Sequence, residues 1–250
     1  MKIAVVRGTD VNVRAPDELL GAVAVGHEVV DPASCEVLVV ALVAGERGPA
    51  VATPWVAMIA RGERSYDEAD RSSVEANADA FVLGAHGLAD AIAWVASEDR
   101  AARTVGPPRL TVIGTSHGDF GNSRTLTAEP TIIGRSMTFE QHPQRPDRMP
   151  TPTGTIARHH AELRWIDGVV SVRDLRSTNG TLVIRHGEPA RLLCPQEQSG
   201  SGHQFGPAAS PWLTRDPSGD WVEIRIGDHL QMHGFWRFRI DGDLLWSAED

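Results

Sequence analysis

Lysine, tyrosine and cysteine are scarce in this 250-residue sequence, and long apolar runs are absent. Lysine and tyrosine each occur once, and cysteine occurs twice. Cys35 and Cys194 lie far apart in the chain, so their spacing predicts neither a disulfide framework nor a zinc site. No apolar run reaches the roughly 20 residues that span a membrane, and the N-terminus lacks the apolar core of a signal peptide. We therefore expect a cytoplasmic protein that has no membrane segment.

Basic residues are fewer than acidic residues, 24 Lys+Arg against 33 Asp+Glu. The formal net charge is −9, which argues against nucleic acid as a main partner, because affinity for phosphate backbones needs Lys and Arg. Residues 1–105 hold 9 Lys+Arg against 16 Asp+Glu, and residues 106–250 hold 15 against 17. Arginine supplies 23 of the 24 basic residues. Guanidinium suits bidentate phosphate binding, although a GC-rich genome also favours arginine.

Sequence motifs for common catalytic and nucleotide sites are missing. The chain has no Walker motif, no Gly-x-Gly-x-x-Gly fingerprint and no nucleophile elbow. We therefore predict no enzyme, no cofactor and no metal. One alternative stays open, a small-molecule or nucleotide site at the carboxyl ends of the strands in the N-terminal half.

The first 105 residues alternate buried-strand runs with helical segments. Apolar runs of strand length occur at 3–6, 26–30, 36–42, 55–60 and 80–83. Helices are expected at 17–25, 67–76 and 88–98. Strands that are apolar on both faces and alternate with helices predict a parallel sheet in an α/β domain.

The order of these elements resembles the receiver domain of response regulators, most of all at 26–30 and 77–81. That family needs acidic residues to hold Mg²⁺ and an aspartate nucleophile. The matching positions here are Arg7-Gly8 and Ala41, and the switch and lysine positions fall near Ala60 and Gly84. The resemblance therefore implies a pseudo-receiver at 1–105, which serves as a docking or homodimerising scaffold.

The second half of the chain predicts an all-β domain at 109–250. Gly106-Pro107-Pro108 breaks both helix and strand ladder, so we expect the boundary there. Strands are expected at 110–113 and 131–133, joined by a polar hairpin tip, and again near 169–175, 181–184, 221–226 and 235–240. Long polar loops are expected at 136–154 and 194–220. The first is either a solvated loop or, through Arg145 and Arg148, a basic rim.

The most informative stretch is Asp174 to Thr181, with the sequence Asp-Leu-Arg-Ser-Thr-Asn-Gly-Thr. By itself Asn-Gly between two strands predicts a hairpin turn. Upstream come Gly134-Arg135 and Arg158-His159-His160-Ala161, and downstream comes Gly227-Asp228. Together these motifs closely resemble the forkhead-associated (FHA) domain, over roughly residues 109–241. The resemblance implies a β-sandwich whose loops bind phosphothreonine peptides.

The resemblance assigns the site residue by residue. Arg135 meets the phosphate, Thr178 donates a hydroxyl to it, and Asn179 pairs with the peptide backbone. Arg158 is either a second phosphate contact or a surface ion-pair partner. His160 has a structural role in the family, and Thr155 and Ser177 are accessory candidates.

The chain departs from the family at one position, where Ala157 replaces the serine that bonds the phosphate. The resemblance implies a non-catalytic adaptor for a phosphorylated protein, the substrate of a Ser/Thr kinase. Because of Ala157, the alternative is a degenerate FHA protein that docks its partner independently of phosphate.

Overall fold

The computed structural model describes residues 1–7, 10–14, 26–43, 48–49, 51–60, 77–83, 87–114, 120–134, 156–194, 213–232 and 236–243. The chain divides into two compact units. The first comprises Met1–Glu98 with Ile113–Phe120, and the second comprises Asp99–Val112 with Gly121–Asp250. Within the described ranges, no helix is both long enough and apolar enough to cross a membrane.

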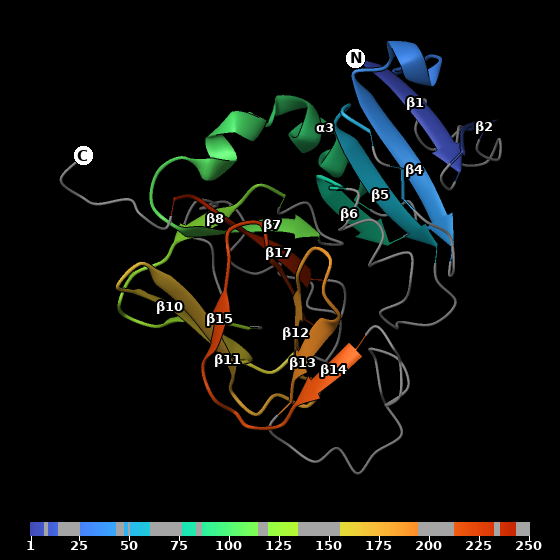
Figure 1. Cartoon of the computed structure of the whole chain (residues 1–250). Coiled ribbons are helices and arrows are strands. Elements are labelled where there is room, and N and C mark those ends of the chain that lie inside the picture. The colour runs from blue at the N-terminus through green and yellow to red at the C-terminus, as the bar shows by residue number, and fades with distance from the viewer. Residues whose placement is uncertain are drawn as a thin grey trace. The chain divides into compact units, whose positions relative to one another are not determined.

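Within its described residues, the first unit has five strands that pair in parallel. They are β1 (Lys2–Arg7), β3 (Glu28–Val29), β4 (Val37–Val43), β5 (Trp55–Ala60) and β6 (Ala80–Leu83). The pairing order is β3-β1-β4-β5-β6, and β1, β4, β5 and β6 are labelled in Figure 1. With strands counted along the chain, and β2 set aside, this is the 2-1-3-4-5 order of flavodoxin-like sheets. A parallel sheet is buried on both faces, which explains why β4 consists only of Val, Leu and Ala.

One α-helix, a 3-10 helix at Pro32–Ser34 and one additional strand are also described in this unit. The helix α3 (Leu88–Ser97) buries Leu88, Ala91, Ile92 and Val95 against the sheet. The strand β2 (Asp10–Arg14) pairs antiparallel with β1 and was not predicted. The helices expected at 17–25 and 67–76 lie outside the described residues.

The second unit is a sandwich of two sheets, visible in Figure 1 as β10, β11 and β15 facing β12 and β13. One sheet has the order β15-β11-β10-β9, from Val222–Ile224, Val169–Asp174, Ala161–Ile166 and Thr131–Ile133. The other runs β14-β13-β12-β16-β17-β7, with β8 paired to β7. Its strands are β7 (Arg109–Gly114), β8 (Ser123–Thr125), β12 (Thr181–Ile184), β13 (Ala190–Leu193), β14 (Leu213–Asp216), β16 (His229–Met232) and β17 (Trp236–Asp241).

Alternating side chains from both sheets form one apolar core. Strand β11 buries Val170 and Val172, β17 buries Phe238 and Ile240, and Leu163 of β10 packs in the same cluster. Because successive side chains of a strand point to opposite faces of its sheet, these residues lie on the inner face and their sequence neighbours lie on the outer face.

Two expectations for this half were wrong. Strands β7 and β9 do not form a hairpin, because β8 pairs with β7 and β9 pairs with β10 in the other sheet. Residues 194–220 were expected to be a loop throughout, but β14 (Leu213–Asp216) pairs parallel with β13. The sequence Leu-Thr-Arg-Asp has a single apolar residue, so alternation gave no signal.

The segment Asp99–Val112, which contains the expected domain boundary, belongs to the second unit. A 3-10 helix at Arg100–Thr104 follows Asp99, whose carboxylate accepts from the Ala101 N–H at 2.9 Å. Beyond it, the Asp243 N–H donates to the Gly106 carbonyl at 2.7 Å. The glycine-proline segment is therefore attached to the chain that follows β17.

Candidate functional site

A buried carboxylate organises the loop between β11 and β12. Asp174, the last residue of β11, accepts from the Ser177 N–H at 2.7 Å and from the Ser177 hydroxyl at 2.8 Å. The Thr181 hydroxyl, at the start of β12, donates to the same carboxylate at 2.7 Å. All three side chains are buried. The two strand ends are therefore joined through one acidic side chain, and the loop between them has a fixed shape.

Backbone conformation shapes the same loop at two further points. Arg176 has φ of 60° and Gly180 has φ of 76°. The Gly180 N–H donates to the Ser177 hydroxyl oxygen at 3.0 Å. A Cβ at Gly180 would lie 2.7 Å from the Leu193 carbonyl oxygen. Glycine is thus required here both for its positive φ and for close approach to β13.

His160 connects this loop with the segment that precedes β10. Its Nε2 lies 2.9 Å from the Gly180 carbonyl oxygen, and a carbonyl only accepts, so Nε2 carries the proton. Its own carbonyl accepts from the Leu175 N–H at 2.9 Å. Burial lowers the pKa of His160, and the Asp174 carboxylate and the Gly180 carbonyl oppose that shift. Burial likewise raises the pKa of Asp174, against the hydrogen bonds from Thr181 and Ser177.

A third segment meets the other two at Gly134, after β9. The His160 N–H donates to the Ile133 carbonyl at 2.9 Å. A Cβ on Gly134 would lie 2.5 Å from the Arg158 carbonyl oxygen and 2.8 Å from that of Ala157. Only glycine leaves room for this contact between backbones. Three motifs that are separate in the sequence therefore converge at one end of the sandwich.

The predicted site residues fall into three groups in this arrangement. Thr178 and Arg158 are exposed and Asn179 is half-buried, on the loops that converge. Ser177 is buried, and its hydroxyl donates to Asp174 and accepts from Gly180, so its bonding serves the loop. Arg135 and Thr155 lie outside the described residues.

Gly227-Asp228 has a different position and a structural task. The Asp228 carboxylate accepts from the Arg225 N–H at 2.8 Å, which closes the turn before β16. The same carboxylate also accepts a hydrogen bond from Arg185 Nη2 at 2.7 Å. This carboxylate-centred turn belongs to the framework rather than to the convergent loops.

Sequence reasoning missed the role of Asp174, although the signal was present. An aspartate at the end of a strand, directly before a turn, is a residue whose side chain commonly accepts from nearby backbone N–H groups. It also missed the left-handed backbone of Arg176, which no sequence pattern marks.

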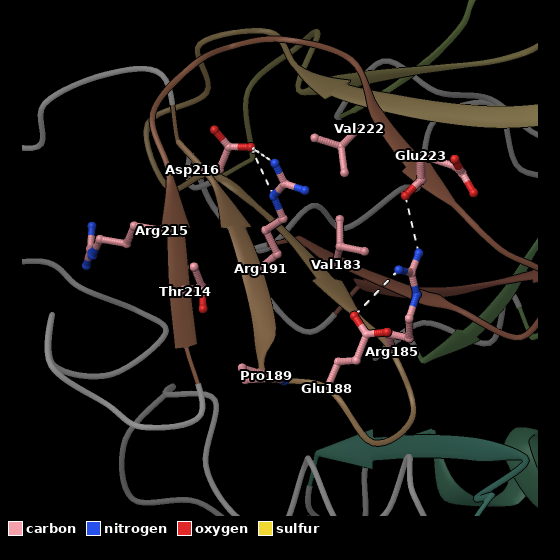
Figure 2. A pocket seen from close by; sticks show the side chains of 10 residues that line it. All are labelled: Val183, Arg185, Glu188, Pro189, Arg191, Thr214, Arg215, Asp216, Val222 and Glu223. Atoms are coloured by element: carbon pink, nitrogen blue, oxygen red, sulfur yellow. Dashed lines mark hydrogen bonds and ion pairs between the residues drawn. The ribbon is translucent and has the colours of Figure 1, made fainter.

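A pocket of about 420 Å³ opens between β12–β13–β14 and β15. Figure 2 shows its ion pairs: Arg191 with Asp216, and Arg185 with Glu188 at 3.6 Å. Arg185 also donates to the Glu223 carbonyl at 3.3 Å. The lining residues are Val183, Arg185, Glu188, Pro189, Arg191, Thr214, Arg215, Asp216, Val222 and Glu223. The ion pairs hold edge strands together, and we assign the pocket no ligand.

Within the described residues, no group of three or more His, Cys, Asp or Glu side chains is placed to hold a metal ion. His159 is exposed and His160 is buried, so these two neighbours do not present their rings to one point.

Comparison with protein families gives a match to the FHA domain model over residues 131–193. This range covers strands β9 to β13 and all three convergent segments. Among curated proteins, none matches this chain.

Solved FHA structures are similar to part of the chain. The FHA domain of FhaA, complexed with the intracellular domain of Rv3910, shares 19% identity over 53% of this chain and 98% of its own, with a TM-score of 0.30. The FHA domain of human APLF, in complex with an XRCC1 bisphospho peptide, shares 18% identity over 54% and 97%, with a TM-score of 0.30. The FHA domain of an Arabidopsis thaliana hypothetical protein shares 15% identity over 61% and 98%, with a TM-score of 0.34.

Proposed function

Because residues 131–193 form an FHA domain, we propose that this chain is a non-catalytic adaptor that binds a phosphothreonine-containing protein. FHA domains are interaction modules, and the loops of the family bind phosphothreonine. The observation that carries the proposal is the loop built on Asp174, which presents Thr178 and Asn179 beside the segment of Arg158.

The chemistry of the site residues suits a phosphothreonine. The phosphoryl group carries a charge of about −1.5 to −2 at neutral pH and three acceptor oxygens. Arg135 and Arg158 supply guanidinium donors, which form charge-assisted bonds to such oxygens. Thr178 supplies a hydroxyl donor. The Asn179 amide both donates and accepts, so it can pair with the peptide backbone beside the phosphothreonine without requiring a particular sequence.

Ala157 weakens this site, because an alanine has no hydroxyl to donate. Its backbone packs against Gly134, and its side chain is half-buried. A hydrogen bond to a charged group contributes about 1.5–3 kcal/mol, or roughly one to two decades in affinity. Phosphate-independent docking of a protein partner is therefore the second candidate function.

Ala157→Ser tests the proposed function against that candidate. We expect the variant to bind a phosphothreonine peptide about 10- to 100-fold more tightly than the native chain. The gain should be absent for the unphosphorylated twin and should shrink as salt rises, because screening weakens the attraction. Calorimetric titration of both peptides measures it. A variant that binds the two peptides alike would favour phosphate-independent docking.

For the N-terminal part we propose a pseudo-receiver at 1–105, before the FHA-like region at 109–250. Ala41, at the phosphoacceptor position, lies within β4 and is buried between its neighbours. We expect no phosphoryl transfer from acetyl phosphate with Mg²⁺. A hydroxylamine-labile mass increase of one phosphate would overturn this assignment. A scaffold that docks a partner or a second copy in the cytoplasm remains our proposal for this part.

A further inference from the structure

The outer face of the sheet β15-β11-β10-β9 carries exposed aliphatic side chains that the proposed phosphopeptide site does not use. Ile132 of β9, Ile166 of β10 and Val169 of β11 are 42%, 38% and 42% exposed. Each lies next in sequence to a residue that packs in or against the apolar core, so it points to the opposite face of the sheet. They are three of the six large hydrophobic residues that are exposed within the described part of the chain. Single exposed hydrophobics are ordinary, but a group on one face indicates a surface that another protein covers.

A tryptophan in contact with two arginines lies on the same outer face. Trp221 directly precedes β15, and the guanidinium carbons of Arg164 and Arg173 lie 3.9 and 4.6 Å from the centre of its ring. Arg173 also forms an ion pair with the carboxylate of Glu162. Stacking on the indole and pairing with the carboxylate hold these long side chains in place. Tryptophan and arginine are also enriched at the centres of protein interfaces.

The register between β10 and β11 arranges this face in three rows that run across the strands. Directly paired residues of an antiparallel sheet point to the same face. The outward pairs are Glu162 with Arg173, Arg164 with Ser171, and Ile166 with Val169. One row therefore couples an acid with a base, the next a base with a hydroxyl, and the third two aliphatic side chains.

A two-fold axis that runs between β10 and β11, parallel to the strands, repeats these pairs between two copies of the chain. It exchanges the two sides of the axis and keeps each row in place, so β10 of one copy faces β11 of the other. Glu162 of one copy then faces Arg173 of the other, and Ile166 faces Val169. At the rims, the exposed isoleucine of β9 meets the tryptophan beside β15. An axis perpendicular to the strands would instead place the charged pair against the aliphatic pair.

We propose that this chain forms a homodimer through the outer face of the sheet β15-β11-β10-β9, with two copies related by the axis parallel to the strands. The complementarity of the face to itself, in charge and in apolar character, selects a second copy as the occupant. Four strands about 4.8 Å apart and five residues at about 3.4 Å each give a face of roughly 19 by 17 Å. Such a face is at the small end of protein interfaces. We therefore expect a reversible dimer with a dissociation constant roughly in the micromolar range.

Sedimentation equilibrium of the full chain measures the association directly. Over loading concentrations from about 1 to 300 µM, which bracket the expected constant, the weight-average mass should rise from 27.0 kDa towards twice that value. Val169→Glu and Ile166→Lys each place a charge against an aliphatic side chain of the other copy. Because a two-fold contact occurs twice in the dimer, each variant should dimerise at least about 30-fold more weakly than the native chain.

An equimolar mixture of the two variants tests the two-fold arrangement itself. In the mixed dimer, the introduced carboxylate and ammonium face each other at one contact, and the native Ile166 and Val169 side chains meet at the other. The mixture should associate at least about 10-fold more tightly than either variant alone. Val105→Glu is the matched control, because Val105 is 64% exposed and lies outside the sheet. It should dimerise like the native chain.

Three results would overturn the proposed dimer. The first is a native chain that stays monomeric over the whole concentration range. The second is a native dimer that both single variants leave intact, because that dimer uses another surface. The third is a mixture that associates no better than its components, which contradicts the two-fold contact between Ile166 and Val169. Recovered association in the mixture excludes unfolding of either variant as the cause of its loss.

Discussion

Asp174→Ala is expected to destabilise the FHA domain by about 3–5 kcal/mol and to abolish phosphopeptide binding. The substitution removes the acceptor of three hydrogen bonds, from the Ser177 N–H, the Ser177 hydroxyl and the Thr181 hydroxyl. Ser177 and Thr181 are 1% and 0% exposed. Their donors would therefore lose a partner away from solvent, at about 1–3 kcal/mol each. The loop that presents Thr178 and Asn179 would also lose its fixed shape.

Urea denaturation and peptide titration measure the two effects on one sample. Asp220→Ala, at an exposed aspartate before β15, is the control for loss of a carboxylate that is not buried. It should change stability by less than about 1 kcal/mol. A loss below about 1 kcal/mol for Asp174→Ala would show that the carboxylate does not organise the loop.

Arg135→Ala is expected to weaken phosphopeptide binding by at least about 100-fold, because truncating one partner of a desolvated charged contact costs about 2–5 kcal/mol. Asn179→Ala is expected to weaken it by a similar factor, because the peptide-backbone donor and acceptor that pair with the amide would each lose a partner, at about 1–3 kcal/mol. Arg135 follows Gly134, where the three segments converge, and Asn179 lies at the tip of the Asp174 loop. Melting temperatures should stay close to native.

Arg225→Ala supplies the matched arginine control. The Arg225 side chain is 60% exposed, and its guanidinium faces Glu188 at 3.9 Å rather than the convergent loops. It should bind the peptide normally, which separates a general loss of positive charge from loss of the site. Native affinity in either Arg135→Ala or Asn179→Ala would remove that residue from the assigned site.

The FHA prediction from sequence is confirmed over residues 131–193. The prediction was possible because the motifs of this domain depend on interactions between residues close together in the sequence. An Asn-Gly pair between two strands predicts a turn, as at Asn179-Gly180. Gly134 lies where the backbone after β9 closely approaches the backbone of Ala157 and Arg158. Such features impose particular residue types. The position of the buried strand β4 was predictable for a related reason, since a run of β-branched and aliphatic residues has few alternatives to burial.

Features that arise from tertiary pairing were not predictable. Strand β14 has no alternation of its own and exists because β13 offers it a hydrogen-bonding edge. Strand β2 is an antiparallel addition to a parallel sheet. Ser177 was an accessory candidate for binding, but its burial depends on where the Asp174 carboxylate lies. The left-handed Arg176 follows from the same carboxylate, which lies two residues before it and accepts from the N–H of Ser177, the next residue.

Capture of partners from cell lysate tests the central claim most directly. The native chain is used as bait in lysate that has been treated with phosphatase and in untreated lysate, and Asn179→Ala is used in parallel. A phosphothreonine-dependent adaptor should retain a partner from untreated lysate, lose it after phosphatase, and lose it in the variant. A partner that is captured equally from both lysates, and equally by Asn179→Ala, would contradict phosphate-dependent binding at this site.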